Sequence, residues 1–338
     1  MSGRRIRALT ALAALPVLAA ALSCSAGSGA DAPSARAGSD GAGAGPGASP
    51  FWVDPASPAA RQVQTWEAAG REEDADLLRL ISERPTAVWP TADAPADDVR
   101  RAVEGAEATD TTAVLVAYNI PHRDCGQYSR GGAADAGAYR AYLAEFARAV
   151  GDHEAVVVLE PDAVPHLVDG CTPAVHHDER YTLLAEAVER FAALPRTTVY
   201  LDAGNPSWIT DPRRLVRPLE RSGIAAADGF ALNVSNFQTD ADVTAYGRRL
   251  SAALGGKHFV IDSSRNGNGP LDGRADVWCN PPGRALGTPP TTETGEPLLD
   301  AYLWIKRPGE SDGECRGGPP AGRWWAEYAL GLARGAAR

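Results

Sequence analysis

Carboxylate, amide and cationic side chains recur directly after short apolar runs along this chain. They are Asn119 with Arg123 and Asp124, Glu160 with Asp162, Asp202, Asn233 with Asn236, Asp262, and Lys306 with Glu310 and Asp312. A single aspartate at such a place is usually a helix cap or a turn former. A ring of carboxylates at successive strand ends would repel one another unless a site required them. Because paired carboxylates can donate and accept protons, the pattern predicts an acid–base catalytic site.

The elements that must position these groups are strands and helices in alternation. Seven apolar, β-branched runs predict strands at Ala87–Trp89, Val114–Ile120, Ala155–Leu159, Thr198–Leu201, Phe230–Val234, His258–Ile261 and Tyr302–Ile305. Stretches with helical spacing separate them, which indicates parallel pairing. The runs show no polar alternation, as expected when both faces of a sheet are covered. We therefore expect an α/β fold, an incomplete or distorted parallel (β/α) barrel of about seven strands, with its cleft at the carboxyl ends of the strands.

The N-terminal segment has the pattern of an export signal. Arg4, Arg5 and Arg7 precede an apolar run over residues 8–22, so residues 1–24 are predicted to be a secretion signal. Cys24 is a candidate for lipidation; the alternative is cleavage beyond it. Residues 25–50 are almost entirely Gly, Ala, Ser and Pro, which predicts a linker, and residues 51–338 would then form one catalytic domain. We expect a bacterial protein that is secreted or lipid-anchored at the outer surface.

Charge and composition narrow the classes of partner. Lys and Arg number 33 against 43 Asp and Glu, a net charge of −10, which disfavours nucleic acid and leaves neutral substrates such as sugars open. The six histidines lack a spacing that would converge metal ligands, and no Gly-x-Ser-x-Gly motif is present. We expect a monomer that uses no cofactor and no metal. We expect contact with a membrane only if Cys24 carries a lipid anchor.

Several motifs together resemble glycoside hydrolase family six, the inverting cellulases. They are Tyr118-Asn119-Ile120-Pro121-His122-Arg123-Asp124-Cys125, Leu159-Glu160-Pro161-Asp162, Leu201-Asp202-Ala203-Gly204, Ile261-Asp262-Ser263-Ser264-Arg265, Trp278-Cys279-Asn280-Pro281 and Trp304-Ile305-Lys306 with Pro308-Gly309-Glu310-Ser311-Asp312. Their order and spacing cover nearly all of residues 51–336. The chain departs from the family at Asn205, where His is common.

The resemblance implies roles for three aspartates. Inversion takes one protonated acid and one group that activates water, about 6.5–9.5 Å apart. Asp162 would be the general acid, because burial after a strand and the charge of Asp124 would both raise its pKa. Asp124 would keep Asp162 protonated and order the water. Asp312 is the candidate base, and proton transfer to Asp124 through a water chain is the alternative.

Other residues would bind the sugar. Trp89, Trp208 and Trp278 follow strands and are candidate stacking platforms, although tryptophan is often simply buried. Further substrate-binding candidates are Tyr118, Asp202, Asn233, Asn236, Lys306 and Glu310. For Glu160 we expect a structural role, an ion pair that orients Arg123 or Lys306.

Four cysteines remain after Cys24, and in an exported protein they should pair. Three pairings are possible. Cys125 and Cys171 follow neighbouring strands, as do Cys279 and Cys315. We therefore expect the disulfides Cys125–Cys171 and Cys279–Cys315, a pairing that the resemblance supports.

The expected activity is hydrolysis of internal β-1,4-glucosidic bonds in cellulose-like or mixed-linkage β-glucans, with inversion. The stretch from Cys279 to Cys315 is short and includes the last predicted strand, which leaves little chain for a roof over the cleft. An open cleft favours an endo-acting enzyme. The alternatives are a non-catalytic glucan-binding surface lipoprotein and an exo-acting cellobiohydrolase.

Overall fold

The computed structural model describes residues 49–271, 273 and 277–337. The predicted signal, Cys24 and nearly all of the predicted linker lie outside these residues. Among the described residues, no helix combines the length and the apolar character that crossing a bilayer would require.

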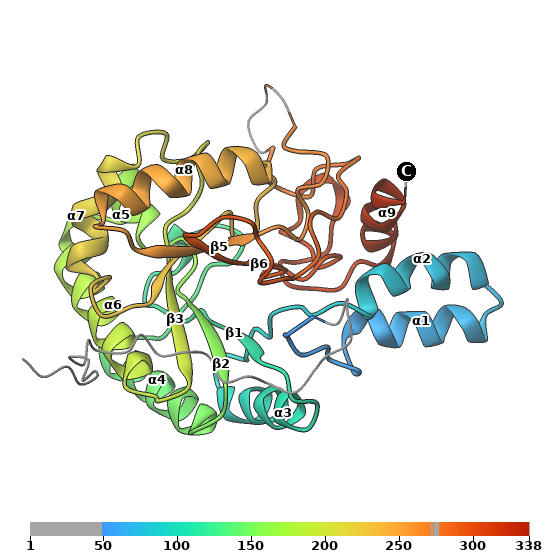
Figure 1. Ribbon diagram of the computed structural model, residues 1–338, viewed down its shortest axis with the longest axis horizontal. Helices are drawn as coiled ribbons and strands as arrows, with labels where there is room; N and C mark the ends of the chain where they lie inside the picture. The colour runs from blue at the N-terminus through green and yellow to red at the C-terminus, as the bar shows by residue number, and fades with distance from the viewer. Residues whose placement is uncertain (1–48, 272, 274–276, 338) are drawn as a thin grey trace, which may run out of the picture. The chain divides into compact units, whose positions relative to one another are not determined.

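The described part of the chain contains one sheet of six parallel strands in sequence order (Figure 1). The strands are β1 (Ala113–Ala117), β2 (Ala155–Leu159), β3 (Thr197–Asp202), β4 (Gly229–Leu232), β5 (His258–Asp262) and β6 (Leu299–Leu303). Leu115 pairs with Val157, and Val157 with Val199, so the first three strands are in simple register. The predicted α/β fold, an incomplete parallel barrel, is confirmed.

The prediction of a seventh strand at Ala87–Trp89 is wrong in part. The segment makes only an isolated parallel bridge, Val88 to Leu115. On its other side, the Ala87 N–H donates to the carbonyl oxygen of Trp304 at 2.9 Å. The segment thus lies between β1 and the chain after β6 and nearly closes the barrel. Pro85 and Pro90 flank it, and since proline has no N–H to donate, the ladder cannot extend in either direction.

Helices cover the outer face of the sheet (Figure 1). They are α3 (Pro95–Glu107), α4 (Ala136–Val150), α6 (His177–Ala192), α7 (Arg213–Arg221) and α8 (Asp240–Ala253). Asp135 caps α4 by accepting from the Ala138 N–H, and Thr239 caps α8 by accepting from the Asp242 N–H. Helices α1 (Pro58–Ala68), α2 (Glu72–Ser82) and α9 (Ala326–Ala336) pack on one another around a smaller apolar cluster that contains Trp66 and Trp304.

Alternate strand residues enter two different cores. Leu115, Val157 and Val199 point outward into the cluster shared with the covering helices. Val116 and Val158 belong instead to the cluster inside the barrel. Because both faces are buried, β1 and β2 contain no polar residue, and polar residues come only after their carboxyl ends; β6 differs, since Asp300 and Tyr302 lie on a partly exposed face.

Two disulfides join loops at this end of the barrel. Cys125, in the 3₁₀ turn η1 (Asp124–Gly126), is bonded to Cys171, which follows the short helix α5 (Pro165–Asp169). Cys279 is bonded to Cys315, in η3 (Cys315–Gly317). The pairing is the predicted one, and each bond should stabilise the fold by about 2–4 kcal/mol.

Candidate active site

A cavity of about 390 Å³ lies where the loops after the strands converge. Nine of the predicted site residues line it: Trp89, Tyr118, Asp124, Asp162, Trp208, Asn236, Trp278, Lys306 and Asp312. These residues come from the loops after all six strands and from the segment at residue 89. The tertiary structure thus brings together most of the side chains that the sequence suggested for the site.

Asp162 and Asp124 occupy turns with unusual backbone geometry. Asp162 has φ +71° and Asp124 has φ +55°, a left-handed conformation that is uncommon for residues other than glycine and that clusters at functional sites. The Asp162 Oδ2 accepts a hydrogen bond from the Tyr118 hydroxyl at 3.3 Å, and the Asp124 Oδ2 accepts from the Ser129 N–H at 2.6 Å. The structure holds each carboxylate through one oxygen.

The pKa of Asp162 is raised to about 6, mainly because its carboxyl is removed from water. His166 acts against this shift, and the nearby charge of Asp124 adds to it. A carboxyl with this pKa keeps its proton in mildly acidic solution, which a general acid must do.

Asp202 does not line the cavity, contrary to the prediction that it contacts sugar. Its side chain is buried, and Oδ2 accepts hydrogen bonds from the Asp162 N–H at 2.9 Å and the Gly204 N–H at 3.2 Å. Burial, followed by the charge of Asp162, raises the pKa of Asp202 well above its ordinary value. Asp202 therefore holds the backbone of Asp162 in place through this hydrogen bond.

Glu160 has the structural role that was predicted, but with other partners. Its buried carboxylate accepts hydrogen bonds from the backbone N–H groups of Asn119 and Ile120, at 2.9–3.1 Å. Arg123 instead donates to the carbonyl oxygens of Tyr118 and Ser129. Burial raises the pKa of Glu160 to about 7, although the backbone donors act against the shift. These bonds also explain why β1 ends at Ala117, three residues before the predicted end.

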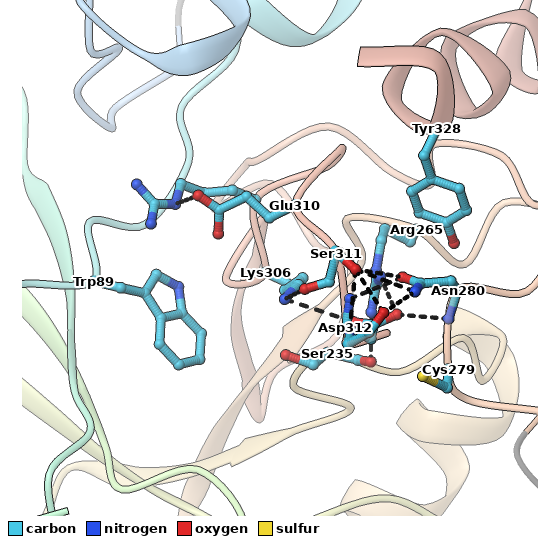
Figure 2. Close-up of polar contacts among 12 residues, drawn as sticks. Trp89, Ser235, Arg265, Cys279, Asn280, Lys306, Glu310, Ser311, Asp312 and Tyr328 are labelled. Carbon is cyan, nitrogen blue, oxygen red and sulfur yellow. Dashed lines mark hydrogen bonds and ion pairs between the residues drawn. The ribbon is translucent and has the colours of Figure 1, made fainter. Parts of the chain in front are cut away.

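Asp312 lies in a dense polar network (Figure 2). Its Oδ2 lies 2.8 Å from the Nη1 of Arg265, and Arg265 is fully buried. The same oxygen accepts a hydrogen bond from the Asn280 N–H at 3.0 Å. Its Oδ1 lies 3.6 Å from the Nζ of Lys306. Burial opposes the ionised form, but Arg265 and Lys306 outweigh it, and the pKa of Asp312 is lowered. Asp312 therefore ionises at a lower pH than Asp162, so in a range of pH Asp312 carries a charge while Asp162 keeps its proton.

Glu310 and Asn233 were predicted to bind substrate, and the structure places neither at the cavity. Glu310 is buried and pairs with the Nε of Arg307 at 2.8 Å, away from Lys306 (Figure 2). Asn233 is buried in the turn after β4, where its amide donates to the carbonyl oxygens of Gln238 and Asp262. Asn233 thereby shapes the loop that presents Asn236 to the cavity.

The three candidate tryptophans are partly exposed at the cavity wall. The Trp89 indole donates to the carbonyl oxygen of Ile305 at 2.8 Å, and its ring meets that of Tyr118 edge to face. The Trp208 indole donates to Asp169 Oδ2 at 2.9 Å. Trp278 packs against Tyr128, which is 48% exposed. Indoles fixed in this way can offer flat faces to a sugar ring.

Asn205 closes the loop that carries Trp208. Its side-chain oxygen accepts hydrogen bonds from the backbone N–H groups of Ser207 and Trp208 and from the Ser207 hydroxyl. The residue where the family commonly has His thus serves as a turn former here.

Two residues at the site were missed by the sequence reasoning. Arg265 follows β5 closely and binds Asp312 across 47 positions of sequence. His166 lies four residues after Asp162, a spacing that puts both on one side of a helical turn and that could have drawn attention to it. A ring nitrogen of His166 and carboxylate oxygens of Asp124 and Asp162 lie within 4.8 Å of one another, so the three side chains interact electrostatically.

We expect the stability of the fold to decrease between about pH 4.5 and pH 7. Glu160 and Asp162 have folded-state pKa values of about 7 and about 6, against ordinary values of 4.5 and 3.8. The folded protein therefore binds more protons than the unfolded chain in this range, and raising the pH favours unfolding. His166, whose pKa is also raised, acts in the same direction.

Thermal unfolding at half-unit pH steps measures this effect. The Asp162→Asn variant should show a smaller slope across the range, because one of the shifted groups is gone. A melting temperature that rises from pH 4.5 to 7 would contradict the expectation.

Comparisons with known proteins agree on one family. The family model described as "Glycosyl hydrolases family 6" matches residues 47–336. Endoglucanase A of Cellulomonas fimi is 43% identical over 292 residues, which are 85% of this chain and 62% of that protein. Endoglucanase 1 of Streptomyces halstedii is 40% identical over 298 residues, 84% of this chain and 88% of that protein. The chain thus spans less than two thirds of the Cellulomonas relative but most of the Streptomyces one.

Solved structures show the same fold. The endoglucanase Cel6 from Mycobacterium tuberculosis, in complex with methyl-cellobiosyl-4-deoxy-4-thio-β-D-cellobioside, superposes with a TM-score of 0.79 and 40% identity, covering 86% of this chain and 99% of that one. The strand order and the cavity lined by carboxylates agree with the family model, the two relatives and the solved structure. This chain belongs to glycosyl hydrolase family 6.

Proposed function

We propose that this protein hydrolyses internal β-1,4-glucosidic bonds of cellulose-like or mixed-linkage β-glucans with inversion of configuration. One observation carries the proposal: a carboxyl group with a pKa of about 6, Asp162, faces a second carboxylate, Asp124, in a cavity walled by tryptophans. Relatives at 40–43% identity are named endoglucanases, whereas those named cellobiohydrolases or exoglucanases are 28–30% identical.

In the proposed reaction Asp162 donates its proton to the glycosidic oxygen as the bond to the anomeric carbon breaks. The negative charge left on Asp162 falls near His166 and Lys306, both of which favour the ionised form. Water attacks the anomeric carbon from the opposite face, so one bond forms as the other breaks.

The attacking water must lose a proton, and two routes are open to it. Asp312 is ionised in the active pH range, as a base must be, but its pairing with Arg265 and Lys306 lowers its basicity. Asp124 stands next to Asp162 and could receive the proton through a chain of waters. Comparing Asp312→Asn with Asp124→Asn distinguishes the routes, since loss of the base should remove nearly all turnover even with an activated leaving group.

For substrate binding we propose stacking on Trp89, Trp208 and Trp278. The indole N–H is the polar group of each side chain. In Trp89 and Trp208 it donates a hydrogen bond to another residue of the protein, which leaves the ring faces available to a sugar. Tyr118, Asn236 and Lys306 would bind sugar hydroxyls at the base of the cavity.

The anomeric configuration of the fresh product tests the mechanism. A single displacement at a β-linkage gives the α anomer at the new reducing end. Proton NMR in the first minutes of hydrolysis should therefore show the α signal before mutarotation mixes the two. Initial accumulation of the β anomer would require a covalent intermediate and would refute the assignment of roles.

The mode of attack is expected to be endo. Cys279 and Cys315 are 36 positions apart, and β6 occupies part of this stretch, so little chain is left to roof the cavity. An open cleft admits internal segments of a polymer. Viscosity of carboxymethyl cellulose should fall steeply while few reducing ends appear; steady release of cellobiose at nearly constant viscosity would indicate a tunnel.

We further propose export, with residues 1–24 as the signal and residues 25–50 as a tether to the catalytic domain at residues 51–338. Lipidation of Cys24 would anchor the protein at the outer surface of a bacterium, and cleavage beyond Cys24 would release it. Mass spectrometry of the mature N-terminus distinguishes the two.

A further inference from the structure

We propose that His166 is a positioning residue whose protonated imidazole places a positive charge beside Asp124 and Asp162 and so sets the pH range in which Asp162 can act as the acid. The inference rests on the proposed function and adds to it a group that belongs to neither the acid nor the base.

His166 is held in place by the turn that carries Asp162. It lies in the short helix α5, which starts at Pro165, and its backbone N–H donates to the Asp162 carbonyl oxygen at 2.9 Å. The Thr172 N–H in turn donates to the carbonyl oxygen of His166 at 3.0 Å. The residue is only 5% exposed, yet it contributes to the cavity wall. Its ring is therefore fixed against the site and cannot simply turn to solvent.

The two ring nitrogens face carboxylates on opposite sides. Nδ1 lies 3.4 Å from Asp169 Oδ2, and Nε2 lies 3.9 Å from Asp124 Oδ1. Nε2 is buried and has no hydrogen-bond partner of its own. Burying a ring nitrogen without a hydrogen-bond partner is unfavourable, and a nearby carboxylate offsets part of this cost when the nitrogen is protonated. An imidazolium, which donates from both nitrogens, fits between two carboxylates; a neutral ring satisfies only one of them.

Within the described part of the chain, the charged groups that act most strongly on the ring are all carboxylates. Asp124 comes from η1, Asp162 from the turn after β2, Asp169 from α5 itself, and Asp202, below Asp162, from the end of β3. The Trp208 ring lies edge to face at 4.9 Å, and the sulfur atoms of the Cys125–Cys171 disulfide lie within 4.8 Å of a ring nitrogen. Burial lowers the pKa of His166, but Asp124, Asp162 and Asp169 outweigh it, and the net shift is upward.

The interaction is reciprocal. If the Asp162 carboxylate favours the charged imidazole, the charged imidazole favours the Asp162 carboxylate and lowers the pKa of that acid. His166 therefore limits the rise in the pKa of Asp162, which burial alone would make larger. Since Asp162 is active only while protonated, removing His166 should move the alkaline limit of activity to higher pH.

The pH profile of kcat/KM on a soluble β-glucan tests this with His166→Gln and His166→Asn. Both variants keep a polar side chain but cannot become cationic. We expect the alkaline limb to move up by about 0.5–1 pH unit, a three- to tenfold gain in relative activity on that limb, and kcat at the optimum to change by only a few-fold. A residue with a purely structural role would lower the melting temperature without moving the limb.

His258→Gln is the matched control. His258 also pairs with a carboxylate, its Nδ1 lying 2.6 Å from Asp300 Oδ1, but it is the first residue of β5, at the end of the barrel away from the cavity. Replacing His258 should leave the alkaline limb of the kcat/KM profile at the wild-type pH. If His166→Gln and His166→Asn show the wild-type limb as well, the proposal is wrong.

Titration of the histidine ring by NMR decides the question without any turnover. The His166 resonance, identified by its absence in His166→Gln, should titrate above the ordinary value of 6.5 and shift downward in Asp162→Asn. A pKa at or below 6.5 that does not respond to Asp162→Asn would overturn the proposal. Failure of the wild-type protein to cleave any β-glucan, with this titration behaviour intact, would instead refute only the proposed function.

Discussion

Replacing Asp162 with asparagine is expected to lower kcat on unactivated β-glucan by about 10²–10⁴-fold, the usual contribution of general acid–base assistance. The amide can still accept the hydrogen bond from the Tyr118 hydroxyl, so the local structure should persist. It cannot donate the acidic proton that the leaving oxygen needs. Initial rates at the pH optimum, with reducing ends as the readout, give the factor.

Two comparisons separate loss of the acid from general damage. A substrate with a very good leaving group, such as a dinitrophenyl cellobioside, should be affected much less, because its departure needs little protonation. Asp135→Asn is the matched variant: Asp135 caps α4, and asparagine caps a helix equally well, so activity should stay at the wild-type level. Retention of more than about a tenth of wild-type activity on glucan by Asp162→Asn would refute the assignment.

Replacing Arg265 with methionine should destabilise the fold by about 3–5 kcal/mol, because it leaves the Asp312 carboxylate buried without its main partner. Arg265 is fully buried, its guanidinium lies 4.4 Å from the centre of the Phe237 ring, and one Nη2 atom donates to the Ser235 carbonyl oxygen. Methionine fills a similar space but supplies neither the charge nor the donors. The midpoint of urea unfolding gives the difference in free energy.

The double variant Arg265→Met with Asp312→Leu should recover much of this stability, since no buried charge is then left unpaired. If Asp312 is the base, activity should not return with stability, because the variant lacks this carboxylate. Arg140→Met is the matched control: its bond to Glu186 is exposed and should contribute less than about 1 kcal/mol. If Arg265→Met costs no more than Arg140→Met, the network in Figure 2 does not stabilise the fold as we infer.

The chain's own sequence determined the architecture and indicated nine of the side chains that line the cavity. Strands buried on both faces must be built mainly from apolar residues, so β1, β2, β3 and β5 are visible as short runs rich in β-branched residues. The loops that follow the strands must lie at one edge of a parallel sheet, so Asp124, Asp162 and Asp312, which belong to these loops, were expected near one another. Cysteines on neighbouring loops of that edge could then be paired correctly.

Only the tertiary structure decided which of these polar side chains reach the cavity and which support it. Strands end here in left-handed turns, with φ +47° at Glu160, +71° at Asp162 and +66° at Asn233, so the alternation of side chains along a strand no longer says where each one points. Glu160 therefore turns to backbone N–H groups, and Asn233 to its own loop.

Partners that are distant in sequence are the second reason. Arg265 neutralises Asp312, and His166 faces Asp124, through contacts that no local pattern encodes. A carboxyl that follows a strand can be predicted from the sequence to lie near the cavity. Its pKa depends on burial and on charges contributed by other loops, and these exist only once the chain has folded.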